Sequence, residues 1–379
     1  VSDSKKPILQ AIGLAPIGST SEVNNSKKSM HARADGGNLK ASQPIEVRGQ
    51  FGVEVSGYDS QDGSYNKNGI YKVKLMVDGS QISTFTADSI AFDVSRHLNA
   101  LIDYSYYFFS KARFLRLYRL PGNKLENIRY QDDGILNLNA GMHEIIVIAE
   151  DVAGNEEHVS FKVNVLPGDK MSAEAEQIKW NIPYIYESEH THVYLPAGTV
   201  YENTLVEIEE SMLGGFPVIS ILEQEIPVQE PFVISITAEP TSIKKGTVIA
   251  QFTESGRPIR SLSTSINENT LSAESRSFGR FSLYIDDQEP RITSINFSNN
   301  KTWSSGKIKF KVNDNFSGIQ SYSAFINGKW VLMEYEPKQE MLSIDVKEIN
   351  KSDDVQDFKL NVTDGAGNVA TFDGRFYRQ

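Results

Sequence analysis

Short stretches in which apolar and polar residues alternate recur along the whole chain. Clear examples are residues 71–77, 144–149, 159–165, 232–237, 307–312 and 358–362. A period of two places one face of a strand on a core and the other face in water. Glycine, asparagine and aspartate separate these stretches, and many short strands between turn signals are typical of β-sandwiches. The pattern therefore predicts an all-β fold.

One segment departs from this alternation. Residues 93–111 place Leu98, Leu101 and Ile102 at helical spacing and follow them with a cluster of tyrosines and phenylalanines. Apolar residues three and four positions apart favour one face of a helix. We expect a short helical segment here, inside an otherwise β-rich chain.

The two ends of the chain carry the same order of turn signals. Residues 55–59 and 69–71 are followed by a strand and an Asp-Gly turn, and residues 312–319 by a strand and an Asn-Gly turn. Each copy then closes with Asp-x-Ala-Gly-Asn, at 151–155 and 364–368. Asp-Gly and Asn-Gly supply the positive φ that tight hairpins need, and the aspartate of the closing motif can accept backbone N–H bonds across its turn.

This repeat predicts three domains in a row. The first, residues 1–168, is an immunoglobulin-like β-sandwich with an aromatic-rich insertion at about 85–135, because the first copy of the repeat is longer than the second. Residues 169–287 form a β-sandwich middle domain, and residues 288–379 form a second immunoglobulin-like β-sandwich. A length of 379 residues also favours two or three domains.

The composition of the chain excludes several classes of function. The net charge is −11, and such a surface repels phosphate backbones, so we expect no nucleic-acid partner. No apolar run approaches the roughly 18 residues that a membrane-spanning helix needs. The chain has no cysteine, which excludes disulfides, thiolate zinc sites and cysteine nucleophiles. The first residues do not resemble a signal peptide, and we interpret the chain as a mature or truncated piece of a longer protein.

The order of the motifs resembles the C-terminal, non-peptidase region of lysostaphin-type zinc metallopeptidases from Bacteroidetes. The segments that carry the resemblance are spread over the chain, at 3–8, 66–71, 92–93, 102–104, 192–198, 277–281, 314–319, 327–330 and 364–368. The resemblance implies an upstream peptidase that cuts peptidoglycan cross-links. That family's zinc ligands are a His and an Asp in one motif and a His-x-His in another, which usually reads His-Leu-His-Phe-Glu, and this constellation does not occur here. The resemblance therefore implies a non-catalytic chain, with zinc only in the upstream peptidase domain and no cofactor of its own.

Two metal sites and one binding surface are candidates. His190 and His192 would project from the same face of a strand and could share a zinc ion with Glu187 or Glu189, but a solvated loop-to-strand junction is the simpler interpretation. Asp59, with Asp62 and Asn66, and Asp314, with Asn315, offer hard oxygen donors for calcium, or they only close turns.

The binding surface lies in the insertion. Tyr104, Tyr106 and Tyr107 precede Arg113 and Arg116. Aromatic rings beside arginines can bind sugars or anionic peptides, or they can simply pack on the first sandwich or on a neighbouring domain.

These observations predict an accessory region of a cell-envelope peptidoglycan metallopeptidase, located in the periplasm or exported. It would position the upstream peptidase domain and bind peptidoglycan, another envelope glycan or a partner. One alternative is an adhesion or glycan-binding β-sandwich protein with no peptidase. The second alternative is a metalloenzyme that uses His190 and His192.

Overall fold

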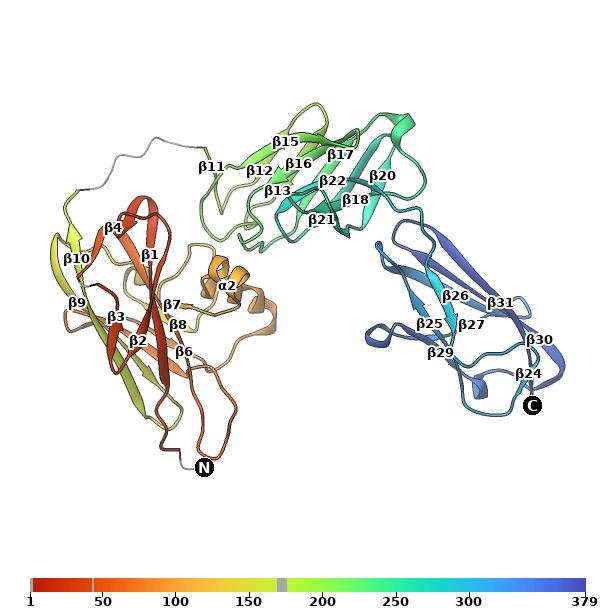
Figure 1. The fold of residues 1–379 in the computed structure, drawn as a ribbon, viewed down its shortest axis with the longest axis horizontal. Coiled ribbons are helices and arrows are strands. Elements are labelled where there is room, and N and C mark those ends of the chain that lie inside the picture. Colours follow the sequence, from red (N-terminus) through yellow and green to blue (C-terminus); the bar gives the residue numbers. More distant parts are fainter. Residues whose placement is uncertain (1–2, 43, 169–175) are drawn as a thin grey trace.

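The computed structural model describes residues 3–42, 44–168 and 176–379. Strands hold 53% of the chain and helices 8%, which confirms the all-β prediction. Three separate hydrophobic cores follow one another along the sequence, the first between Leu9 and Val165, the second between Ile178 and Leu283, and the third between Phe297 and Phe376. Figure 1 shows the corresponding β-rich bodies in red to yellow, green and blue. The domain boundaries drawn from the sequence stay a prediction.

The first body is built on one sheet that curls back on itself. Its order is β7-β4-β1-β2-β3-β10-β9-β5-β6-β8, and β4 also pairs with β10. This extra pairing is parallel and aligns Val163 with Ile45. It closes β4, β1, β2, β3 and β10 into a small barrel-like ring, where the sequence had suggested two separate layers. The strands are β1 (Ile8–Val23), β2 (Met30–Asp35), β3 (Asn38–Lys40), β4 (Ile45–Tyr58), β5 (Lys72–Val77), β6 (Ser80–Thr86), β7 (Leu115–Arg116), β8 (Ile128–Tyr130), β9 (Gly141–Glu150) and β10 (Glu156–Leu166).

The helical segment expected at 93–111 is present, but in three short pieces. They are the 3₁₀ helix η1 (Phe92–His97), α1 (Leu98–Leu101) and α2 (Tyr104–Ser110). The side chain of Asp103 accepts a hydrogen bond from the backbone N–H of Tyr106 and so caps α2. A left-handed residue, Lys111, ends α2. A second 3₁₀ turn, η2, covers Asp132–Gly134.

The second body is a sandwich of two five-stranded sheets, with orders β12-β13-β17-β21-β20 and β15-β16-β22-β18-β19, beside the small pair β11-β14. Phe232, Phe278 and Phe281 lie fully buried in its core. The elements are β11 (Gln177–Ile178), β12 (Tyr184–Glu187), β13 (Thr191–Leu195), β14 (Thr204–Leu205), β15 (Ile208–Leu213), β16 (Phe216–Ile221), β17 (Phe232–Thr237), η3 (Pro240–Ser242), β18 (Thr247–Phe252), β19 (Pro258–Ser261), β20 (Thr264–Asn267), β21 (Thr270–Ser275) and β22 (Gly279–Ile285).

The third body is a sandwich with sheet orders β23-β25-β29-β28 and β24-β31-β30-β26-β27. Phe310 and Phe358 stack across its core with ring centroids 5.4 Å apart. The elements are β23 (Arg291–Ser294), β24 (Lys301–Trp303), β25 (Lys307–Asn313), β26 (Ile319–Ile326), β27 (Lys329–Val331), β28 (Glu334–Glu336), η4 (Pro337–Gln339), β29 (Met341–Asp345), η5 (Val346–Glu348), β30 (Ser352–Asp364) and β31 (Val369–Arg378).

The three bodies touch at two junctions. At the first, Tyr201 of the second body joins Ala15, Ala100, Tyr118 and Leu120 of the first in a small apolar cluster. At the second junction, the ring of Tyr284 lies 4.5 Å from that of Phe316. Contacts between side chains at such junctions restrict how neighbouring domains move.

Candidate functional site

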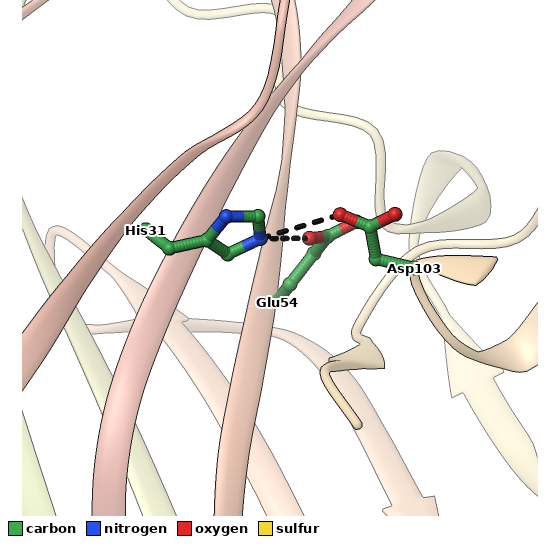
Figure 2. A group of neighbouring side chains, drawn as sticks. All are labelled: His31, Glu54 and Asp103. Carbon is green, nitrogen blue, oxygen red and sulfur yellow. Dashed lines mark ion pairs between the residues drawn. The ribbon is translucent and has the colours of Figure 1, made fainter. Parts of the chain in front are cut away.

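A buried ionic network lies beneath the helical insertion. Figure 2 shows His31 from β2 pointing at the carboxylates of Glu54 from β4 and Asp103, the residue before α2. The Nε2 atom of His31 lies 3.4 Å from Glu54 Oε2 and 3.2 Å from Asp103 Oδ2. Strand pairing brings Gly13 of β1 opposite both His31 and Glu54. A Cβ atom at Gly13 would come within 2.9 Å of the imidazole, so only glycine leaves the ring room.

Two further side chains complete the network. Arg116 Nε lies 3.3 Å from Glu54 Oε1, and the hydroxyl of Tyr118 donates to that same oxygen at 2.9 Å. Glu54 is fully buried. A buried carboxylate needs such partners, because removing an unpaired charge from water costs several kcal/mol.

The surroundings of His31 favour its charged form. Burial alone would lower the pKa of His31, but the facing carboxylates of Asp103 and Glu54 outweigh it and raise the pKa to about 9. Burial also acts on Asp103, yet His31 and the backbone N–H of Tyr106 lower the pKa of this carboxyl group. At neutral pH, therefore, two cations and two carboxylates face one another.

This network holds the start of α2 in place. The guanidinium of Arg116 lies beside the buried carboxylate of Glu54 and balances its charge. Asp103 is both the cap of α2 and a partner of His31, so the network fixes the start of the helix. Tyr106, one turn into the helix, packs its ring 4.2 Å from the imidazole of His31 and 5.1 Å from the ring of Phe114.

An open cleft begins where this helix meets the second body. It has a volume of about 460 Å³ and takes its wall from Tyr104, Ser105 and Arg116 on one side. Most of its floor and far wall comes from the second body, and Leu120 of the first body completes it. The apolar part consists of Leu120, Val200, Tyr201, Leu205, Ile226 and Pro227, and the polar part of Glu202, Asn203, Thr204, Glu207, Glu223 and Glu225.

The cleft is acidic. Burial, and then the charges of Glu225 and Glu207, raise the pKa of Glu223. Arg116 is the cation among the lining residues, and its side chain is only 13% exposed. An anionic ligand would therefore meet carboxylates first, whereas a neutral ligand with hydroxyl groups would meet hydrogen-bond acceptors.

The residues of the binding surface predicted from sequence lie in different environments in the structure. Tyr104 and Arg116 line the cleft, whereas Tyr106 serves as packing against His31. Tyr107 faces the guanidinium of Arg113, whose central carbon lies 5.6 Å from the ring centroid. The sequence did not point to the acidic and apolar residues of the second body, because nothing in the local pattern of residues 200–227 shows that they face α2.

The predicted zinc pair stays a prediction. His190 is exposed in the turn before β13, and His192 Nε2 lies 3.6 Å from Glu187 Oε1. In the part of the chain that the structure describes, three groups of acidic and histidine side chains could hold a metal ion, and neither histidine belongs to one. Among the described residues, neither histidine therefore lies in a cluster of three possible ligands.

The two calcium candidates do fall into such groups. Asp59 meets Asp3 and Asp151, and Asp314 meets Asp286 and Asp364. Asp62 and Asn66, which the sequence grouped with Asp59, make other hydrogen bonds. Asp62 accepts from the backbone N–H and the hydroxyl of Ser4, and the backbone N–H of Asn66 donates to the hydroxyl of Ser64. Asn315 is exposed. The sequence carried a signal for the missed aspartates, because Asp151 and Asp364 open the repeated Asp-x-Ala-Gly-Asn motif.

Comparisons with known protein families find matches to two parts of the chain. A Zu5-like domain model matches residues 175–286, and a family model without a description matches residues 29–166. No curated protein matches the chain. Neither family match links the chain to a lysostaphin-type peptidase, so that resemblance rests on the sequence motifs.

Several solved structures are similar to the chain at low identity. A surface glycan-binding protein of the Bacteroides ovatus mixed-linkage glucan utilization locus, in complex with a mixed-linkage heptasaccharide, is 12% identical with a TM-score of 0.16, over 86% of this chain and 63% of that one. A bacterial ice-binding adhesin is 9% identical with a TM-score of 0.17, over 88% and 94%. Dimeric latent PorU from Porphyromonas gingivalis is 10% identical with a TM-score of 0.18, over 98% and 34%. The chain thus spans less than two thirds of the glucan-locus protein.

Proposed function

We propose that this chain is a non-catalytic array of β-domains at the cell envelope, of the adhesion or glycan-binding kind, and that the cleft between the first two bodies binds a neutral saccharide. The observation that carries the proposal is the cleft itself, which pairs an aromatic side chain and an apolar floor with a rim of carboxylates and an amide. Ligand sites in proteins combine an apolar surface with a few convergent polar groups in this way.

The chemistry of the rim favours saccharides. Carboxylate and amide oxygens accept hydrogen bonds from sugar hydroxyls, and the half-buried ring of Tyr104 offers an apolar face to a pyranose ring. The buried network beneath α2 keeps this ring in place, since Asp103 and Tyr104 are adjacent. Preorganisation of this kind reduces the entropy lost on binding.

The same network supports a non-catalytic role. Glu54 is engaged by Arg116 and Tyr118, and Asp103 by the backbone of α2. The envelope location, and peptidoglycan as one of the polymers to test, rest on the resemblance to the accessory regions of envelope peptidases. Positioning an attached peptidase would be a second task of the same array.

The test is affinity gel electrophoresis of the full chain in gels that contain soluble peptidoglycan fragments or mixed-linkage β-glucan. We expect retardation by at least one polymer and a loss of about tenfold in affinity for Tyr104→Ala, a substitution that the first turn of a helix tolerates. Tyr65→Ala is the matched control, because Tyr65 is a fully exposed loop tyrosine. Equal migration with and without both polymers, or equal retardation of Tyr104→Ala and the native chain, would contradict the proposal.

A further inference from the structure

Three aspartates from separate segments converge at the start of the third body. Asp286 follows β22, Asp314 follows β25, and Asp364 ends β30. One carboxylate oxygen of each lies within 4.8 Å of the others. In the described residues, no lysine, arginine or histidine forms an ion pair with any of the three.

Two carboxylate oxygens of this trio, one from Asp286 and one from Asp314, are buried and receive no hydrogen bond. Asp286 is only 2% exposed, and its Oδ2 atom is buried without a hydrogen-bond partner, as is Oδ1 of Asp314. Oδ2 of Asp314 and both carboxylate oxygens of Asp364 accept hydrogen bonds. Backbone N–H groups of Phe316 and Gly318 donate to Oδ2 of Asp314 at 2.9 Å. A buried carboxylate oxygen without a donor is costly unless a cation completes it.

Asn368 locks the third carboxylate in place. Its backbone N–H donates to Oδ1 of Asp364 at 2.8 Å, and its side-chain amide donates to Oδ2 at 2.9 Å. The same amide also donates to the backbone carbonyl of Asp286 at 2.8 Å. One asparagine therefore sets the distance between the first and third aspartates.

The first body repeats this arrangement. Asp3, Asp59 and Asp151 each place a carboxylate oxygen within 4.8 Å of the other two. Asp59 is 7% exposed, and its Oδ1 atom is buried without a hydrogen-bond partner. Asn155 takes the place of Asn368, since its side-chain amide donates to Oδ2 of Asp151 at 2.8 Å and to the backbone carbonyl of Asp3 at 3.0 Å.

The repetition shows that turn closure alone does not explain the trios. The aspartate of the closing motif would satisfy its turn without Asp3 or Asp286, yet each copy brings in an aspartate from the segment that leads into the domain.

We propose that each trio binds one calcium ion, at Asp3, Asp59 and Asp151 in the first body and at Asp286, Asp314 and Asp364 in the third. Calcium is the divalent cation that takes six to eight oxygen ligands in irregular geometry, which suits carboxylates from three loops together with backbone carbonyls and water. The trios contain no histidine or cysteine, so they do not suit zinc. This inference is independent of the saccharide cleft.

The ion in the third body fixes the junction with the second. The backbone N–H of Asp286 donates to the carbonyl oxygen of Gly246 at 2.9 Å, so Asp286 is tied to the second body while its side chain faces the third. Tyr284 and Phe316 already touch at this junction. Calcium at Asp286 couples the two bodies more firmly than their small apolar contact does, and calcium at Asp3 fixes the segment that leads into β1.

The test is isothermal titration calorimetry of the full chain after removal of metal by chelation. We expect two bound Ca²⁺ per chain and no comparable heat with Mg²⁺. Asp59→Asn should remove one ion and Asp286→Asn the other, whereas Asp373→Asn, at an exposed aspartate of β31, should keep both. No saturable binding of Ca²⁺, or two ions in both site variants, overturns the proposal, and an equal response to Mg²⁺ overturns the assignment to calcium.

Thermal unfolding separates calcium binding from a purely structural role. Without calcium, Asp286→Asn removes one of three facing charges and should raise the Tm, while 1 mM CaCl₂ (about the level at which extracellular calcium modules fill) should raise the Tm of the native chain above that of the variant. If Asp286→Asn instead lowers the Tm equally with and without calcium, its role is structural and the proposal fails.

Discussion

The hydroxyl of Tyr201, in the second body, lies 2.8 Å from the backbone carbonyl oxygen of Arg96, in the first. The same hydroxyl lies 2.6 Å from Oε1 of Gln229. Tyr201 is 2% exposed, and its backbone carbonyl accepts a hydrogen bond from the N–H of Gly122 at 2.7 Å. One tyrosine therefore holds the two bodies together on the floor of the cleft.

Tyr201→Phe should loosen this junction without unfolding either body. The phenylalanine ring keeps the apolar contacts, while the hydroxyl bonds are lost and the carbonyl of Arg96 loses its donor, a change of about 1 kcal/mol. We expect a lower urea midpoint and a larger radius of gyration in small-angle X-ray scattering. Tyr194→Phe, at a tyrosine 37% exposed on the second body, is the control. Superimposable scattering curves for Tyr201→Phe and the native chain would show that the hydroxyl does not hold the junction.

Stability should fall at alkaline pH because of His31. The folded-state pKa of about 9 lies above the ordinary value of 6.5, so the stabilisation is complete below pH 6.5 and is lost as the pH rises through 9. At about 1.4 kcal/mol per pH unit, the loss totals about 3 kcal/mol. Urea unfolding between pH 6 and pH 10 measures it.

The matched variants for this experiment are His31→Gln and His158→Gln. His31→Gln should flatten the profile between pH 6.5 and 9, whereas His158→Gln, at an exposed histidine of β10, should leave it unchanged. A native profile that is flat over this range, or one that His31→Gln does not alter, is incompatible with a protonated His31 in the network.

Gly52→Ala should destabilise the first body. A Cβ atom at Gly52 would lie 2.2 Å from Cδ1 of Tyr118, so the ring must move, and its 2.9 Å hydrogen bond to Glu54 is disturbed. Overpacking of a core typically costs about 1–3 kcal/mol. Gly69→Ala is the control, since a Cβ atom at Gly69 would have no neighbour within 4 Å. Chemical denaturation of both variants checks the prediction, and equal midpoints would show that Tyr118 has room to move.

The alternation of apolar and polar residues predicted the strands well, whereas the sequence motifs predicted only some of the residues that come together in the folded chain. The alternation at Phe232–Thr237 appears as alternately buried and half-buried residues in β17, because a strand's two faces are set by its own residues. Helical spacing at 93–111 also held, although Asp103 interrupts it by capping α2. The closing of the first sheet through β4 and β10 could not be predicted, since it depends on contacts between strands about 120 residues apart along the chain.

None of the described helices has the length and hydropathy to cross a membrane.

The sequence by itself determined the β-rich architecture, the paired turn motifs and the acidic character of this protein, because strand period, turn chemistry and charge are properties of neighbouring residues. Only the tertiary structure decided which charges meet. Asp3 and Asp151 are distant in the chain, as are His31 and Asp103, and each pair is brought together by strands that bury the side chains in one place. Whether a carboxylate acts as a ligand or as an ion-pair partner depends on its burial and on its neighbours in space. The local sequence specifies neither the burial nor the neighbours.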